Sequence, residues 1–404
     1  MTIKNNLYDS VSGALFQKTK NVIAGAGNSP QCNYAKDSFF LLRGSGSRLY
    51  DTEGKEYVDM WSMGSIILGH ANQKVVEAVS KAIGDGLPCG TCQRKEIELA
   101  ELILNALPEY DSVRFFNSTA DASLAAIKQA KLFTKRDLII KFATSPADGS
   151  NSSNEIITAQ YDDEGAFESL IKKHSDRIAA VLIEPLPANY GLLLQRKEFL
   201  KFVRELTWRN GSLLIFDELS SALRIHFGGY YHLLNIVPDI IVMGNIIGNG
   251  MSIGVIAGLD SVMRLMTTNC YSFNSSFANP VVLYAGIAVM EQLTSGDIYG
   301  KLDSLGRKFA LLLKESKIPY AKFQQAGSIL WLHLDMGELP RIPQRISSVA
   351  VKRFNKFYCG LLKRGFFISS SAYDPIFLSS THSEQDVERF AFAIIDELTQ
   401  MESV

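Results

Sequence analysis

Acidic side chains stand directly after two apolar runs that are typical of buried strands. Glu184 follows residues 178–183, and Asp217 and Glu218 follow residues 212–216. In open α/β folds, ligands bind outside the carboxyl ends of the strands. A buried carboxylate needs a cationic or hydrogen-bond-donating partner, and a protonated ring nitrogen of a ligand is one. The other interpretation of each acid is that it caps the helix that follows.

A second candidate site joins a predicted strand at 112–116 to a predicted helix at about 120–133. The turn between them contains Ser118 and Thr119. The first N–H groups of a helix lack partners within the helix and carry partial positive charge, so such a turn can bind phosphate. Serine and threonine also favour helix N-caps for purely structural reasons. The residues alone leave both interpretations open.

Composition excludes several classes of protein. The 404 residues are 47% hydrophobic and 21% charged, with a formal net charge of −1. This balance gives no electrostatic reason to expect nucleic acid or an anionic membrane as a partner. No stretch approaches the ~20 apolar residues of a spanning helix, and the first ten residues do not read as a signal peptide. Five scattered cysteines favour a reducing compartment, so we expect a cytoplasmic protein. The ligand expected at the strand ends is a small molecule.

The order of elements predicts an α/β fold. Alternating runs around an acidic Gly turn at 49–59 predict a hairpin, and apolar spacing predicts helices at 72–85 and 93–107. Further strands are expected at 138–142, 240–243, 329–334 and 366–369, with an N-terminal helix at about 7–22 and a final helix from residue 384. Continuous apolar runs suit a mostly parallel sheet covered by helices on both faces.

The change of pattern after about residue 300 predicts a division of the chain. Residues 1–60 would form an N-terminal arm and part of a small domain, 61–299 a large domain, and 300–404 the small C-terminal domain. The small α+β domain would therefore be built from both chain ends.

Several ordered motifs resemble those of the class III aminotransferases, a fold-type-I family that uses pyridoxal 5′-phosphate (PLP), and within it glutamate-1-semialdehyde aminomutase in particular. The similarity covers nearly the whole chain. The segments that carry it are Ala24-Gly-Ala-Gly-Asn-Ser-Pro30, Asp51-Thr-Glu-Gly-Lys-Glu-Tyr-Val-Asp59, Ile66-Ile-Leu-Gly-His70, Val113-Arg-Phe-Phe-Asn-Ser-Thr-Ala-Asp-Ala122, Ile183-Glu-Pro185, Leu214-Ile-Phe-Asp-Glu-Leu-Ser-Ser-Ala-Leu-Arg224, Ser275-Ser-Phe-Ala-Asn-Pro280 and Asp374 through Arg389.

This resemblance implies roles for particular residues. Ser118 and Thr119 would hold the cofactor phosphate, and Asp217 would pair with the pyridine nitrogen so that the ring acts as an electron sink. The other implied residues are Ser275 and Ser276, which would reach the phosphate of a neighbouring subunit in a homodimer, and Ser29, Arg43, Glu184 and Asp374 near the substrate.

Asn245 is the main departure from the family pattern. In the family, a strand ends in Gly-Lys and the lysine forms a Schiff base with PLP, whereas here the strand at 240–243 is followed by Gly244-Asn245. An amide nitrogen is not nucleophilic and cannot form an imine. PLP, or its amine form pyridoxamine phosphate (PMP), would therefore bind non-covalently if it binds, and ordinary Schiff-base transamination is not expected.

Two further departures lie near the same site. The family has an aromatic residue that stacks on the cofactor and then a long loop, whereas residues 143–156 are short, polar and without an aromatic. The glycine of the family's phosphate motif has become Thr119, which would crowd the phosphate. Three interpretations remain open: a non-standard enzyme with non-covalent PLP or PMP, an enzyme that uses the cleft without the cofactor, and a catalytically inactive pseudoenzyme or partner subunit. His226 and His382 are candidates for a replacement base only by residue type.

Overall fold

A seven-stranded sheet forms the centre of the molecule. The computed structural model describes residues 11–26, 40–88, 91–143, 155–266 and 279–402. The strand order is β4-β10-β9-β8-β7-β5-β6, and every neighbouring pair is parallel except those that β10 makes. The strands are β4 (Ser112–Phe116), β5 (Leu138–Phe142), β6 (Ile156–Ala159), β7 (Ile178–Ile183), β8 (Leu213–Asp217), β9 (Ile240–Met243) and β10 (Gly254–Gly258).

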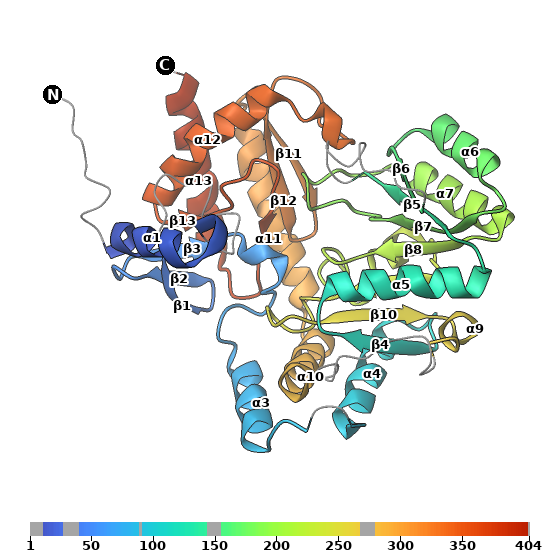
Figure 1. The fold of residues 1–404 in the computed structure, drawn as a ribbon. Helices are drawn as coiled ribbons and strands as arrows, with labels where there is room; N and C mark the ends of the chain where they lie inside the picture. The colour runs from blue at the N-terminus through green and yellow to red at the C-terminus, as the bar shows by residue number, and fades with distance from the viewer. Residues whose placement is uncertain (1–10, 27–39, 89–90, 144–154, 267–278, 403–404) are drawn as a thin grey trace.

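Helices cover both faces of this sheet because its central strands are apolar on both sides. All six residues of β7 and all four of β9 are buried. Helix α5 (Thr119–Thr134) packs against one face through its alanines, while α6 (Glu164–Lys173) and α7 (Lys197–Asn210) cover the other. This layering is visible in Figure 1, and the expected mostly parallel α/β architecture is confirmed.

Two smaller sheets lie beside the large one. The first has the order β1-β2-β3-β13, and β3 pairs in parallel with β13, so it joins segments about 300 residues apart in sequence. The second has the order β11-β12-β14. The strands are β1 (Leu41–Ser45), β2 (Arg48–Asp51), β3 (Glu56–Asp59), β11 (Ala321–Ala326), β12 (Ile329–Leu334), β13 (Phe366–Phe367) and β14 (Ile376–Phe377).

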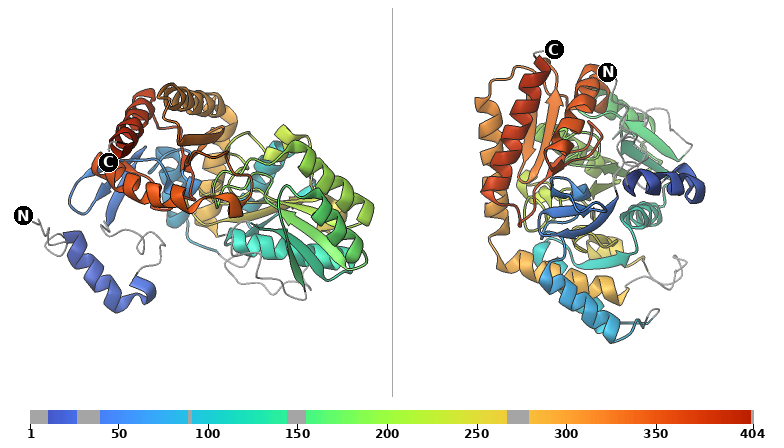
Figure 2. Two further views of the ribbon diagram at one scale, coloured as in Figure 1. Left: turned by 90° about the horizontal axis from the view of Figure 1, so that it is seen from above. Right: turned by 90° about the vertical axis from the view of Figure 1, so that its left-hand side faces the viewer.

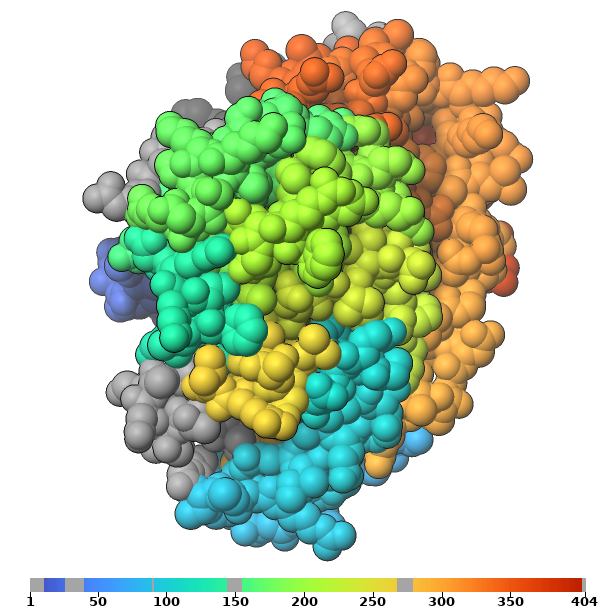
Figure 3. All heavy atoms as spheres, turned by 90° about the vertical axis from the view of Figure 1, so that its right-hand side faces the viewer, coloured from blue at the N-terminus to red at the C-terminus, as the bar shows by residue number. Residues whose placement is uncertain are grey.

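The remaining helices surround these sheets. Helices near the C-terminus pack on the small sheets, and α1 lies at the periphery in both views of Figure 2. Figure 3 shows the molecule from the right-hand side of Figure 1. Residues of the helices that cover the large sheet form this surface, and the segment around residue 300 runs along its margin. These helices are α1 (Val11–Val22), α3 (Gln73–Gly84), α4 (Arg94–Ala106), α8 (Tyr230–Leu234), α9 (Asp260–Met263), α10 (Pro280–Ser295), α11 (Ile298–Glu315), α12 (Ser348–Lys363) and α13 (Glu384–Glu402). Among the described residues, no helix is long and apolar enough to cross a membrane.

Most predicted elements agree with the structure within a few residues. The hairpin at 49–59 is the antiparallel pair β2–β3, and the strands at 112–116, 138–142 and 178–183 have the predicted bounds. The antiparallel β10 and the edge strand β6 were not predicted. The strand expected at 366–369 ends after two residues, at Phe367. The proposed division of the chain near residues 60 and 300 stays a prediction.

Candidate ligand site at the carboxyl edge of the large sheet

Glu184 and Asp217 lie side by side at the edge where the parallel strands end. Asp217 is the last residue of β8, Glu184 directly follows β7, and the register pairs Ile183 with Phe216. Both side chains keep some contact with solvent. The backbone N–H of Leu219 donates to Asp217 Oδ1 at 3.2 Å. The structure therefore brings the two predicted carboxylates together.

Protein atoms surround both carboxylates closely enough to disfavour their charged forms. Burial, and then the charge of Asp217, raises the pKa of Glu184 to about 8. Burial also raises the pKa of Asp217, against the opposing effects of the Leu219 N–H, Lys141 and a hydrogen bond from Ser123. Asn189 Nδ2 donates to Glu184 Oε1 at 3.1 Å, which favours the charged form of Glu184. The pair is thus held at the sheet edge without a cation in direct contact among the described residues.

Glu218 has a different role from its neighbour, because successive strand residues point to opposite sides. It is fully buried, and its carboxylate accepts hydrogen bonds from the Tyr230 N–H, the Tyr231 N–H at 3.0 Å and Ser221 Oγ at 3.0 Å. Tyr230 and Tyr231 begin α8, so Glu218 caps that helix. Burial raises its pKa to about 7 despite these donors. The helix-cap interpretation of the acidic pair is therefore correct for Glu218 alone.

The turn at Ser118 is both a helix cap and an open helix end. Ser118 Oγ accepts from the Asp121 N–H at 3.1 Å and donates to Asp121 Oδ2 at 2.7 Å. One hydroxyl satisfies only one of the first N–H groups of α5, and the others need partners from outside the helix. A Cβ at Gly254 would lie 2.1 Å from the Ser118 carbonyl oxygen, so β10 must carry glycine here for the turn to approach it.

Position 245 lies against this turn. A Cβ at Gly244 would be 2.0 Å from Thr119 Cγ2, so the Thr119 methyl group fills the space beside the residue that precedes Asn245. The Asn245 carbonyl accepts from the Gly250 N–H at 3.3 Å. Its side-chain amide is partly exposed and has no hydrogen-bond partner in the described part of the chain. Asn245, Thr119 and Ser118 thus share one corner of the sheet edge, and Val242, three residues before Asn245, pairs with Asp217.

The remaining predicted residues are more scattered. Arg43 is exposed on β1, with its guanidinium 3.7 Å from the centre of the Tyr50 ring on β2. Asp374 is partly buried and accepts a hydrogen bond from Ser369 Oγ at 2.5 Å, and burial raises its pKa. Within the described part of the chain, no hydrogen bond or ion pair joins either residue to the two carboxylates. Ser29, Ser275 and Ser276 lie outside the described residues, as does most of the shortened 143–156 segment.

An aromatic pair connects Asp374 to the sheet edge indirectly. Tyr190, which follows Asn189, stacks on Tyr373 with 3.9 Å between ring centres, and the Gly191 N–H donates to the Tyr373 carbonyl at 2.5 Å. Gly191 has φ +84°, and a Cβ there would be 3.1 Å from the Trp331 ring. The loop after β7 is therefore fixed against the segment that contains Asp374.

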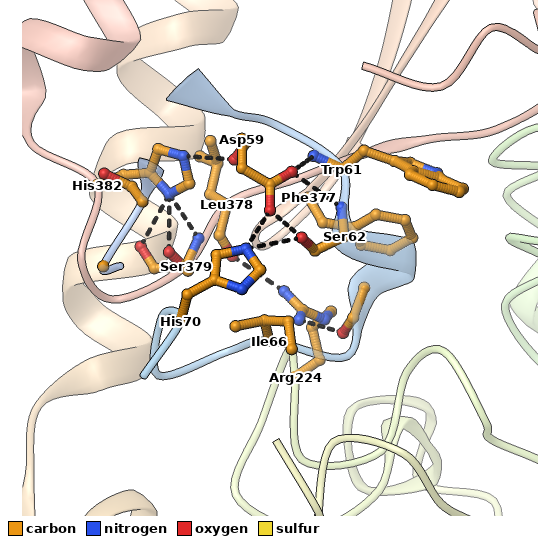
Figure 4. A pocket seen from close by; sticks show the side chains of 13 residues that line it. Asp59, Trp61, Ser62, Ile66, His70, Arg224, Phe377, Leu378, Ser379 and His382 are labelled. Atoms are coloured by element: carbon orange, nitrogen blue, oxygen red, sulfur yellow. Dashed lines mark hydrogen bonds and ion pairs between the residues drawn. The ribbon is translucent and has the colours of Figure 1, made fainter. Parts of the chain in front are cut away.

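The two candidate bases are placed elsewhere. His382 is buried, its Nδ1 accepts from the Ser379 N–H at 2.9 Å, and this fixes Nε2 as the donor to the Asp59 carbonyl at 3.0 Å. Burial lowers the pKa of His382. His226 lies 5.3 Å from the His232 ring, and burial lowers its pKa as well. Figure 4 shows these contacts of His382, which join two segments of the chain and make it a structural residue.

The polar cluster around Asp59 in Figure 4 includes a serine, a histidine and an aspartate. His70 Nε2 lies 2.6 Å from Asp59 Oδ2 and 3.1 Å from Ser62 Oγ. A Ser-His-Asp triad needs the acid on one ring nitrogen and the serine on the other, whereas here both use Nε2. The enclosed space, about 10 Å³, is about what one water requires. This cluster therefore joins segments of the fold and does not form a ligand site.

Three residues of the site were missed by the sequence analysis: Lys141, Asn189 and Ser123. The sequence contains an indication of Lys141, because it is a charged residue in the otherwise apolar run Leu138-Ile-Ile-Lys-Phe142, and lysine is seldom buried without a partner. It contains none of Asn189 and Ser123, since each lies in a polar or helical segment where such residues are common.

Comparison with known proteins agrees with this geometry. The profile of the aminotransferase class-III family matches residues 32–147 and 145–329. The glutamate-1-semialdehyde 2,1-aminomutase of Akkermansia muciniphila is 32% identical over an alignment of 423 positions, and the alignment covers 96% of this chain and 99% of that protein. The corresponding protein of Desulforudis audaxviator is 31% identical, covering 94% of this chain and 95% of its own.

Solved structures show the same fold. An omega-transaminase from Sphaerobacter thermophilus superposes with a TM-score of 0.89 at 28% identity, covering 98% of this chain and all of its own. A transaminase with PLP bound gives 0.86 at 27% identity, covering 97% and 98%. A glutamate-1-semialdehyde aminomutase from Pseudomonas aeruginosa, with one lysine changed to alanine and in complex with PMP, gives 0.87 at 17% identity, covering 96% and 94%.

The fold is that of the PLP-dependent fold-type-I transaminases. The chain belongs to the class III aminotransferase family.

Proposed function

We propose that this chain is a lysine-less class III aminotransferase homologue that binds PLP or PMP non-covalently and acts on a small amino or carbonyl substrate. It does not perform ordinary Schiff-base transamination, because Asn245 occupies the lysine position and its amide cannot form the covalent bond to the cofactor.

The state of Asp217 carries this proposal. Its carboxylate has a raised pKa and no ion pair with any described residue, although it lies at the ligand-binding edge of the sheet. A protonated pyridine nitrogen would supply the missing cation and favour the charged carboxylate. Family membership supports the same assignment, since PLP and PMP are bound in structural neighbours.

The other residues present also suit the cofactor. The open N–H groups at the start of α5, with Ser118, would hold the phosphate, and the missing Cβ atoms of Gly244 and Gly254 let backbone approach this turn. Thr119 narrows the phosphate site and would weaken binding. When bound, PLP supplies an electron sink. The chain's own residues would orient the ring through Asp217 and hold a proton on Glu184, whose pKa of about 8 keeps it protonated at neutral pH.

Proton transfer needs a base other than residue 245. His382 does not serve, because both of its ring nitrogens are engaged with backbone groups. Glu184 faces the ligand side with a pKa of about 8, close enough to neutral pH for it to exchange a proton there, whereas the carboxylate of Glu218 is occupied in capping α8. Ser29, Arg43 and Asp374 stay candidates for contacts with the substrate.

The second candidate is a catalytically inactive pseudoenzyme or a partner subunit of an aminotransferase-like complex. The observation that favours it is the threonine at position 119, where the phosphate motif of the family has glycine. The methyl group of Thr119 packs on Gly244. We propose a homodimer, with Ser275 and Ser276 contributing across the interface; a hetero-oligomer with a lysine-bearing homologue would favour the partner subunit instead. A stable dimer of this kind would bury about 2,000 Å² or more, and a monomer at micromolar concentration in light scattering would contradict it.

An absorbance spectrum of the purified protein with added PLP separates these functions. The proposal predicts a cofactor band that is lost on dialysis, and no covalent adduct on the peptide containing Asn245 after borohydride treatment. The absence of any band would favour the pseudoenzyme or a cofactor-free enzyme. A band that survives dialysis, with an adduct on this site, would refute non-covalent binding.

A further inference from the structure

Lys141 lies on the same sheet face as Glu184 and Asp217. The register pairs Lys141 on β5 with Leu182 on β7, and Leu182 with Ile215 on β8. Residues paired across strands point to the same face, and residues two apart on a strand do so too. Glu184 follows Leu182 by two residues and Asp217 follows Ile215 by two. The three charged side chains therefore project from neighbouring strands toward the α5 side.

The buried core identifies this face independently. Leu182 and Ile215 belong to the hydrophobic cluster that contains the alanines of α5, as does Ile139, two residues before Lys141. Strands are about 4.8 Å apart, so β5 and β8 are separated by about 10 Å. An extended lysine side chain from β5 can reach the space above β7, on the side of Glu184 away from Asp217.

We propose that Lys141 is the positioning residue that supplies the cation for the Glu184–Asp217 pair and so sets the net charge that the site offers to a ligand. Glu184 is protonated at neutral pH, so the charged groups on this face are the Lys141 ammonium and the Asp217 carboxylate. By favouring the charged form of Asp217 from a distance, Lys141 keeps this carboxylate available to a ligand with a single cationic group, such as a protonated ring nitrogen. This inference rests on the proposed function only for the identity of that ligand.

The electrostatics of the site agree with this geometry. Lys141 favours the charged form of both acids and lowers the pKa of each relative to burial alone. The lysine makes no ion pair with a described residue, so it acts on the acids from beyond 4 Å. The groups that face the acids are Lys141 from β5, the acids themselves from β7 and β8, the Ser123 hydroxyl from α5, and the Asn189 amide from the loop after β7.

A test without ligand comes first. Removing the ammonium group in Lys141→Met raises the pKa of both acids further above their unfolded values. A carboxyl group with a raised folded pKa stabilises the fold below its unfolded pKa, and this stability is lost as the pH rises through the folded pKa. The extra loss in Lys141→Met therefore appears mainly above the pKa of about 8 that Glu184 has in the native protein.

The measurement is the melting temperature of the native protein, Lys141→Met and Lys141→Arg at pH 5.5 and pH 9. We expect Lys141→Met to melt several degrees lower at pH 9 than at pH 5.5, relative to the native protein, and Lys141→Arg to follow the native protein. The control is Lys131→Met, because Lys131 pairs with the exposed Glu155 at 2.7 Å, and its effect should not change with pH. An equal loss at both pH values would show a purely structural role and overturn the proposal.

A second test uses PMP, which has no aldehyde that could react with surface lysines. Binding at pH 7.5 should be about tenfold weaker in Lys141→Met, a change equivalent to one pKa unit, and close to native in Lys141→Arg. Unchanged PMP affinity in Lys141→Met would contradict the role of Lys141. If the native protein binds no PMP while the stability of Lys141→Met depends on pH as predicted, the cofactor proposal fails and the assignment of Lys141 stands.

Discussion

Two regions of this molecule are rich in titratable side chains, and they differ in how completely the protein satisfies them. In the cluster around Asp59, the carboxylate accepts bonds from the Trp61 N–H at 3.0 Å, the Ser62 N–H at 3.1 Å, Ser62 Oγ and His70. At the edge of the large sheet, Glu184 and Asp217 have few donors and no contacting cation among the described residues.

This difference separates structural residues from candidate functional ones. A polar group whose hydrogen-bonding capacity is used by the protein stabilises the fold, whereas a buried group left with capacity is costly unless a ligand completes it. Arg224 illustrates the first case only in part, because its Nε has no hydrogen-bond partner among the described residues. It is fully buried, and its guanidinium donates to the Ser328 hydroxyl at 3.2 Å and to the carbonyls of Leu378 and Gly64.

The largest loss of stability is expected in the cluster around Asp59, where the protein itself supplies the hydrogen-bond donors. Asp59→Ala removes the acceptor shared by two backbone N–H groups, a hydroxyl and His70, so we expect a loss of about 3–5 kcal/mol in the free energy of unfolding. Urea unfolding at pH 7 measures it. Asp217→Ala is the matched comparison, and we expect a change within about 1 kcal/mol because that acid has little to lose. Equal losses in the two variants would remove the distinction between the regions.

Neighbouring acids sharpen the same contrast. Glu218→Ala leaves the N–H groups at the start of α8 and Ser221 Oγ without an acceptor in a buried site, and should cost about 2–4 kcal/mol. Glu184→Ala, at the sheet edge, should cost much less. Urea unfolding of both variants tests this, and a greater loss for Glu184→Ala would mean that the structural and ligand-facing acids have been assigned the wrong way round.

The pH dependence of stability should come partly from Glu184. Its pKa rises from 4.5 to about 8 on folding, so its contribution is fully present below pH 4.5 and is lost as the pH rises to about 8. Glu184→Gln should flatten the fall in unfolding free energy across this range, by at most about 1.4 kcal/mol per pH unit and by less because solvent reaches the side chain. A curve identical to that of the native protein would show that Glu184 ionises normally.

Reversion at position 245 should have the smallest effect on activity. Asn245→Lys supplies an amine that can reach the cofactor, so some covalent attachment of PLP is expected. The stacking aromatic and covering loop of the family are still missing from the sequence, and small misplacements of reacting groups can cost about 100-fold in rate. We therefore expect little half-transamination with a panel of amino acids. Turnover close to that of ordinary class III enzymes would show that Asn245 was the only defect.

Much of the fold could be predicted from the sequence because its signals are local. The apolar runs that became β5, β7, β8 and β9 are continuous, and each is bounded by polar residues. The antiparallel β10 was missed because Gly254-Val-Ile-Ala-Gly258 is short, is bounded by glycines and contains nothing that indicates its direction.

The site was less predictable because its geometry depends on strand order. The sequence indicated that Glu184 and Asp217 end strands, yet only the pairing of β7 with β8 makes them neighbours. Strand alternation predicts that Asp217 and Glu218 point to opposite sides of the sheet. It does not predict which helix Glu218 caps, because that depends on the fold bringing Tyr230 back to this carboxylate. The place of Lys141 beside them depends on β5 pairing with β7 and not with β8.

The most direct test of the account is the affinity for PMP, measured by equilibrium dialysis at pH 7.5, in the native protein and in Asp217→Asn. The control is Asp137→Asn, which changes an exposed acid paired with Arg177. If Asp217 pairs with the ring nitrogen, PMP should bind reversibly to the native protein and to the control, and at least about tenfold more weakly to Asp217→Asn, the loss expected when a charged partner of the ring nitrogen is removed. Equal affinity in Asp217→Asn, or no binding to the native protein, would contradict the account.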